Sequence, residues 1–252
     1  TLYVLFGCLS GAIVWNIITW LFGMPTSSSH ALIGGLVGAA VTANGWNIVI
    51  EDGLTKILVF IVAAPIIGFT LGAAINTVIR NIFTRETECQ DKWFRRLQLV
   101  SSACYSMGHG ANDAQKTAGI VFLIMLASGM IVKGDPIPMW AIWTSFAVMG
   151  LGTLFGGWRI VQTLGFKLTE LSPRQGFAAE TGGSVMLFTA SAMGVPVSTT
   201  HVITGSILGA GASQPEPHVK WKKARDILVA WILTIPCSAL LGSAFFYIST
   251  HI

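Results

Sequence analysis

GMPTSSSHALIGGLVGA, the stretch from Gly23 to Ala39, decides the fold of this protein because the chain contains a second copy of it. The copy reads GVPVSTTHVITGSILGA and runs from Gly194 to Ala210, at an offset of 171 residues. Both copies interrupt an apolar segment with a glycine, a proline and a run of hydroxyl side chains. Interrupted helices at matching places in two halves are typical of transporters. We therefore predict two homologous halves, each with a broken helix.

The composition of the chain indicates a membrane protein. Its 252 residues are 53% hydrophobic and only 10% charged, whereas a soluble domain carries about 25% charged residues. Spanning helices need roughly 20 apolar residues. Four runs are long enough: Leu2–Phe22, Ile57–Ile79, Met139–Phe155 and Ile227–Tyr247. No run alternates as a membrane barrel strand does, so we expect helices, which satisfy their own backbone hydrogen bonds in lipid.

Basic residues cluster in segments that the positive-inside rule places in the cytoplasm. These segments are Arg80–Arg96, Arg159–Arg174 and Lys220–Arg225. The poorly basic connections 44–56 and 133–138 then lie outside. An outer loop therefore follows the first broken helix and an inner loop follows the second, which predicts that the two halves are inverted. The stretch Gly176–Ser213 is short for two full crossings, so we expect half-helices or a re-entrant hairpin there.

These patterns predict an all-α, polytopic membrane helical bundle with inverted-topology repeats and broken or re-entrant half-helices. Residues 1–79 form the remainder of the first repeat, 80–97 a cytoplasmic connecting loop, and 98–252 the second repeat. The chain opens at Thr1 directly in an apolar run, so we expect that an N-terminal piece of the natural protein is missing. The net charge of +4 is modest, and the basic residues are expected in loops. We therefore expect no nucleic-acid partner.

The hydroxyl runs give each broken helix a start that suits an anion. A helix start exposes free backbone N–H groups and the positive end of the helix dipole, and nearby hydroxyls can cap it or donate to an anion. We predict that the two starts meet at the membrane midplane around a tetrahedral anion. The candidate ligands are Thr26, Ser27, Ser28, Ser29, Ser198, Thr199 and Thr200. His30 and His201 follow the hydroxyls. Three roles are open for them: a ligand of the anion, part of a gate, or a purely structural residue.

The motif GHGANDAQKTAG, from Gly108 to Gly119, places polar groups at membrane depth, where ionisable residues usually mark function. Its candidate residues are Asn112, Asp113, Gln115 and Lys116. Asp113 and Lys116 are three residues apart, so on a helix they can simply pair. In the functional interpretation, Asn112, Asp113 and Gln115 serve a coupling cation, and Lys116 balances the charge of the anion. Glu180 is a further coupling candidate, with polar packing as its alternative.

Three motifs make the chain resemble the inorganic phosphate transporter (PiT) family: GANDAQKTAG at 110–119, PTSSSH at 25–30 and PVSTTH at 196–201. That family has two homologous halves, each with an Asn-Asp motif and a later Pro-x-Ser-[Ser/Thr]-[Ser/Thr]-His motif. The first Asn-Asp motif is absent here, because the chain begins after it. The resemblance implies symport of phosphate with Na⁺ or H⁺ by alternating access in the inner cell membrane, without a cofactor. Relatives that carry sulfate or metal–phosphate complexes define the alternatives.

A membrane enzyme and a passive anion channel are the rival classes. Ser28, His30 and Asp113 suggest a nucleophile, a base and an acid, but the chain has no GxSxG elbow. His109 and Asp113 could hold a metal, yet no third ligand is evident. We therefore predict a transporter that is not an enzyme and has no metal site. Its partners are phosphate and the lipid bilayer, and homo-oligomerisation is left open.

Overall fold

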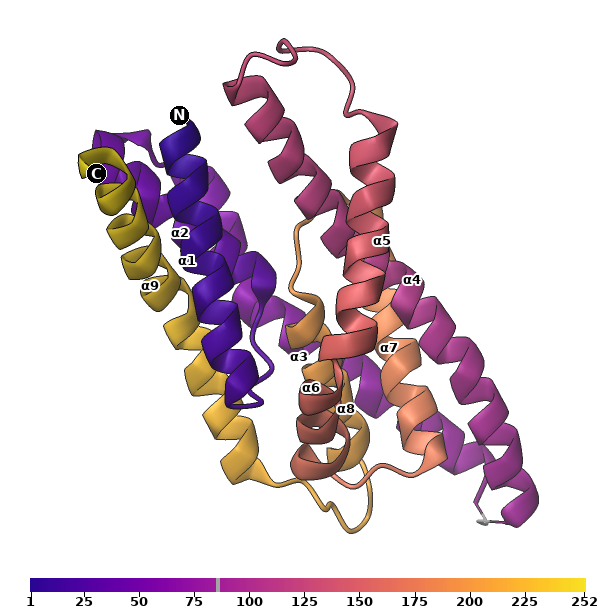
Figure 1. Cartoon of the computed structure of the whole chain (residues 1–252). Helices are drawn as coiled ribbons and strands as arrows, with labels where there is room; N and C mark the ends of the chain where they lie inside the picture. The colour runs from indigo at the N-terminus through magenta and orange to yellow at the C-terminus, as the bar shows by residue number, and fades with distance from the viewer. Residues whose placement is uncertain (85–86) are drawn as a thin grey trace. The chain divides into compact units, whose positions relative to one another are not determined.

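The computed structural model describes residues 1–84 and 87–252, and every regular element within them is a helix (Figure 1). The elements are α1 (Leu2–Leu21), α2 (Ser28–Asn44), η1 (Trp46–Ile48), α3 (Glu51–Ile82), α4 (Glu88–Ala127), α5 (Met139–Gly156), α6 (Trp158–Gln162), η2 (Thr163–Leu168), α7 (Pro173–Ala192), α8 (Thr199–Ala212) and α9 (Trp221–His251). The predicted all-α class is therefore confirmed. Arg85, which belongs to the first basic segment, lies outside the described residues.

Among the described residues, four helices are long and apolar enough to cross a membrane, namely α1, α3, α5 and α9. They coincide with the four runs predicted from the sequence. The polar motif at 108–119 lies within α4, whose 40 residues form one continuous helix about 60 Å long. Residues 88–97 belong to the same helix, so the prediction of a loop over 80–97 is wrong for them. The basic residues there are good helix formers, and their charge indicates a side of the membrane without excluding a helix.

The helix boundaries repeat at the offset of the sequence motif. Shifted by 171 residues, α1 has the bounds of α7, and α2 begins at Ser28 where α8 begins at Thr199. Helices α3 and α9 follow these hairpins, and each contains a proline at the matching position, Pro65 and Pro236. The structure thus supports two homologous parts. Their limits at 1–79 and 98–252 and their opposite orientation stay predictions.

The turn inside each hairpin has the same backbone path. Gly23 has φ 63° and Gly194 has φ 65°, a region that side chains larger than glycine disfavour. A proline two residues later keeps the preceding residue extended, so neither helix can continue through the turn. After the second turn, α8 has only 14 residues, about 21 Å of helix, less than the ~30 Å of a hydrocarbon core. This length agrees with the predicted half-helix.

The chain divides into two compact units, each taking segments from distant parts of the sequence. Unit 1 comprises residues 1–55, 113–157 and 227–252, and unit 2 comprises 56–112 and 158–226. In unit 1, α2 packs on α1 and on α9 (Figure 1). In unit 2, α8 packs on α7 and on α3. Small residues allow these close approaches, as is usual between helices in membranes.

Basic side chains of unit 2 bind the carboxyl ends of helices. Arg80 donates from Nη1 to the carbonyl oxygen of Ser213 at 2.6 Å, just past the end of α8. Arg174, which is buried, donates from Nη1 to the carbonyl oxygen of Phe83 at 3.0 Å, just past α3. Cations stabilise these helix ends because the last carbonyls have no helical partner. Two residues predicted as topology determinants therefore also hold helix ends in place.

Candidate functional site

The start of α2 in unit 1 is capped by a serine. The Ser27 hydroxyl oxygen accepts a hydrogen bond from the backbone N–H of His30 at 3.2 Å, and both side chains are buried. The hydroxyls of Thr26 and Thr19 are hydrogen-bonded at 2.8 Å across the turn. Because a single cap satisfies only one of the first amides of a helix, this start keeps the positive character that attracts anions.

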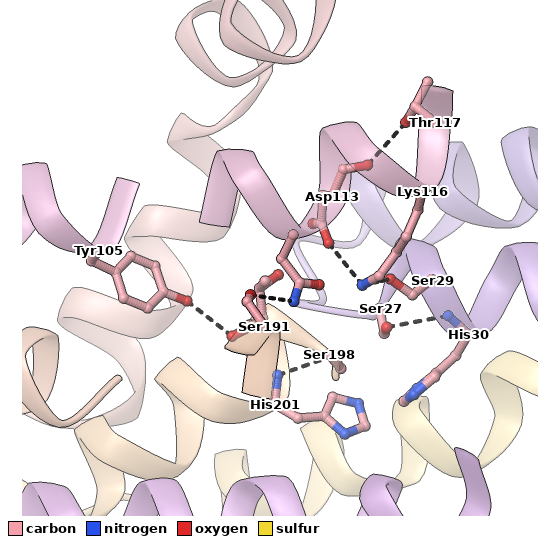
Figure 2. Close-up of polar contacts among 12 residues, drawn as sticks. Ser27, Ser29, His30, Tyr105, Asp113, Lys116, Thr117, Ser191, Ser198 and His201 are labelled. Carbon is pink, nitrogen blue, oxygen red and sulfur yellow. Dashed lines mark hydrogen bonds and ion pairs between the residues drawn. The ribbon is translucent and has the colours of Figure 1, made fainter. Parts of the chain in front are cut away.

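Lys116 from α4 lies at the same helix start. Its Nζ donates to the Ser29 hydroxyl oxygen at 2.8 Å and to Asp113 Oδ1 at 3.1 Å (Figure 2). The side chains of Asp113 and Lys116 are 16% and 23% exposed, so the ion pair is largely shielded. An ammonium group thus lies against a hydroxyl in the first turn of α2. The structure brings these three predicted residues together.

The turn before α2 is also held by a residue that the sequence did not point to. The buried Trp231 of α9 donates from Nε1 to the carbonyl oxygen of Pro25 at 2.8 Å. Indole N–H groups usually find a partner when they are buried. The two residues are far apart in the chain, so no local pattern in the sequence could have revealed the bond. Trp231 therefore fixes the turn from which the capped helix begins.

We expect Trp231→Phe to lower the free energy of unfolding by about 1–3 kcal/mol, because it leaves the buried Pro25 carbonyl without its donor. Trp46→Phe is the matched control, since Trp46 is 72% exposed, and we expect its effect to stay within about 0.5 kcal/mol. Denaturant unfolding in detergent measures both variants. Equal losses for the two would contradict a special role for Trp231.

The start of α8 in unit 2 repeats this arrangement. The Ser198 hydroxyl oxygen accepts the backbone N–H of His201 at 3.2 Å. The hydroxyl of Tyr105 in α4 donates to the carbonyl oxygen of Thr199 at 2.9 Å. Ser198, Thr199 and His201 are all buried. Tyr105 is a second positioning side chain that the sequence motifs missed, and it holds α8 as Trp231 holds the turn of unit 1.

Two further predicted residues of unit 2 lie in polar contacts. Asn112 is 6% exposed and donates from Nδ2 to the Ser191 hydroxyl oxygen at 3.5 Å. Its Oδ1 is buried and has no hydrogen-bond partner among the described residues. Glu180 Oε2 accepts a hydrogen bond from the Ser101 hydroxyl at 2.6 Å. Asn112 therefore offers a shielded oxygen, and Glu180 is bound to a neighbouring helix.

Three predicted ligands lie outside these contacts. Ser28 and Gln115 are exposed, and Thr200 is half-buried. The Thr200 carbonyl accepts a bond from the Thr204 hydroxyl within α8 at 2.7 Å. Their assignment as anion or coupling-ion ligands stays a prediction. Within the described part of the chain, no group of three or more His, Cys, Asp and Glu side chains could hold a metal ion.

A bundle of apolar helices with two like hairpins, each with a capped and hydroxyl-rich helix start, defines a multi-pass membrane protein of the transporter type. Comparison with known sequences identifies its family. The phosphate transporter family matches residues 1–92 and 84–242, and the chain belongs to that family. The predicted resemblance and the predicted place in the cell membrane are thereby confirmed.

Two relatives are named as probable low-affinity inorganic phosphate transporters. The protein from Rhizobium meliloti is 49% identical over 97% of this chain and 73% of its own length. The protein from Bacillus subtilis is 40% identical over 97% of this chain and 74% of its own length. A solved structure of a protein named as a sodium-dependent phosphate transporter has the same fold, with a TM-score of 0.85 and 23% identity, over 99% of this chain and 80% of that one. These relatives are transporters, which fits the prediction of a protein that is not an enzyme.

Proposed function

We propose that this protein carries inorganic phosphate across the cell membrane by symport with Na⁺ or H⁺. The observation that carries the proposal is the Lys116 ammonium group bound to Ser29 in the first turn of α2. A helix start, hydroxyls and an ammonium group together provide hydrogen-bond donors and positive charge for a phosphate dianion. The names of the two bacterial relatives support phosphate as the substrate.

The start of α8 supplies a second set of donors of the same kind. Its hydroxyls Ser198 and Thr199 are buried and its N-cap has the same geometry as that of α2. A hydroxyl group can donate its hydrogen to a phosphate oxygen, which is a strong acceptor. That both helix starts hold one phosphate, as the sequence predicts, remains part of the proposal.

The coupling cation is assigned to Asn112 and Asp113, with Glu180 as a further candidate. Small hard cations prefer oxygen ligands, and Asn112 Oδ1 is a buried oxygen without a hydrogen-bond partner among the described residues. The sodium dependence named for the protein of the matched structure favours Na⁺. The Asp113 carboxylate, however, already has an ammonium partner in Lys116, which competes with Na⁺ for the carboxylate oxygens. Na⁺ and H⁺ are therefore both tested.

Uptake of labelled phosphate into liposomes that contain the purified full-length protein tests the proposal. We expect saturable accumulation that requires an inward gradient of either Na⁺ or H⁺, each imposed separately. Liposomes without protein are the control. Uptake that does not saturate and needs no gradient would indicate a channel. Faster accumulation of sulfate than of phosphate would identify a sulfate carrier instead.

The α8 start is tested by a double variant. We expect Ser198→Ala with Thr199→Val to weaken phosphate binding by at least about tenfold, because it removes a helix cap worth about 1 kcal/mol and a hydroxyl donor to a charged ligand. Thr204→Val is the control, since the buried Thr204 hydroxyl binds the Thr200 carbonyl inside the same helix. Equilibrium binding of labelled phosphate measures both. Unchanged affinity in the double variant would remove this turn from the site.

A further inference from the structure

The proline in the middle of α3 leaves a backbone carbonyl without its helical partner. In an α-helix each N–H bonds to the carbonyl four residues before it, and Pro65 has no N–H. The carbonyl of Ile61 therefore lacks its usual donor. In a membrane such a carbonyl costs several kcal/mol unless a neighbouring group satisfies it. The Ile61 carbonyl therefore needs a hydrogen-bond donor from another helix.

The imidazole of His201 lies where that donor is needed. His201 Nδ1 is 3.4 Å from the Ile61 carbonyl oxygen, and the side chain is fully buried. Because a carbonyl oxygen can only accept, this bond requires the proton on Nδ1. Figure 2 shows the ring turned away from the labelled Tyr105 and Ser191. The ring of His201 therefore lies where its Nδ1–H can donate to the Ile61 carbonyl of α3.

One turn further along α8, the backbone also lies directly against Pro65. A Cβ atom added at Gly205 would overlap the carbonyl oxygen of Pro65. His201 and Gly205 thus contact the same segment of α3, His201 by a hydrogen bond to Ile61 and Gly205 by close approach to Pro65. The backbone N–H of His201 is at the same time the donor to the Ser198 cap. His201 therefore links the segment of α3 around Pro65 to the start of α8.

We propose that His201 is a positioning residue whose imidazole N–H replaces the missing N–H of Pro65, and so holds the start of α8 against the segment of α3 that contains Ile61 and Pro65. Of the roles that the sequence left open for His201, this is the structural one. Its consequence for transport rests on the proposed function, because α8 begins with the hydroxyls assigned to phosphate. The hydrogen bond itself does not depend on that function.

A double-mutant cycle tests the link between the two residues. We expect His201→Ala to lower the apparent melting temperature in detergent and to weaken phosphate binding at least about tenfold. Pro65→Ala restores the N–H inside α3. In that background we expect His201→Ala to change the melting temperature, and the logarithm of the phosphate affinity, by less than about a third of its effect in the wild type. Pro236→Ala is the matched control, because it removes the equivalent proline from α9 and leaves the full His201 effect. Equal losses in all three backgrounds would overturn the proposal.

Two measurements keep the test decisive if Pro65→Ala fails to fold. His201→Asn places an amide N–H where Nδ1 lies, so we expect it to restore most of the stability that His201→Gln loses. Nitrogen NMR of labelled histidine should show His201 with its proton on Nδ1, and a ring protonated only on Nε2 would refute the bond. Neither these measurements nor the melting arm of the cycle uses phosphate, so they separate a failure of this proposal from a failure of the proposed function.

Discussion

Asp113→Asn in the full-length protein is expected to abolish gradient-driven phosphate uptake, lowering the initial rate by at least about a hundredfold. The carboxylate is the ion-pair partner of Lys116 at 3.1 Å and both side chains are largely shielded. Its loss leaves the ammonium group without a counter-charge, which costs about 3–5 kcal/mol when a pair is buried. It also removes the charge to which the coupling cation is assigned. Initial rates in liposomes, at equal amounts of folded protein, measure the effect.

The charge-balanced variant Asp113→Asn with Lys116→Gln separates two interpretations of this result. If Asp113 serves only to neutralise Lys116, removal of both charges restores uptake. If Asp113 takes part in coupling, the double variant remains inactive although its fold no longer contains an unpaired charge. We expect the second outcome. Accumulation at the wild-type level in Asp113→Asn alone would reject Asp113 as the coupling residue.

Gly38→Ala and Gly209→Ala are expected to cause the largest loss of stability in the chain, about 3 kcal/mol or more each. A Cβ atom at Gly38 would overlap the carbonyl oxygen of Ala239, and one at Gly209 would overlap that of Phe69. In each case the obstacle is a helix backbone, which cannot rotate away as a side chain can. The helix pairs α2–α9 and α8–α3 must therefore separate. Unfolding in detergent and the yield of folded protein measure the change.

The controls are glycines at which an added Cβ atom would contact no other element. A Cβ at Gly119 in α4 or at Gly152 in α5 would meet nothing within 4 Å. Because alanine favours a helix over glycine by about 1 kcal/mol, we expect these substitutions to be neutral or slightly stabilising. A loss at Gly119 or Gly152 equal to that at Gly38 would show that the helix contacts of α2 and α8 are not the cause.

Much of the architecture could be read from local patterns. The apolar runs predicted the four spanning helices, and the motif repeated at 171 residues predicted two like hairpins. The hydroxyl after each proline predicted the helix starts, which Ser27 and Ser198 cap. Residues 88–97 were predicted as part of a loop and are helical, because a cluster of basic residues carries no information about helix or loop. The pairing of Asp113 with Lys116 was one of two alternatives, since three-residue spacing on a helix permits it without requiring it.

The sequence by itself determined that the chain spans a membrane as helices, where the helices break, and which hydroxyls begin the two short ones, because hydropathy, proline and glycine act on the residues next to them. Only the tertiary structure decided that Lys116 reaches Ser29, that Trp231 and Tyr105 hold the two helix starts, and that His201 lies on the Ile61 carbonyl. These partners are distant in the chain. Which donor satisfies which carbonyl is set by helix packing, and packing leaves no periodic signal in a single sequence.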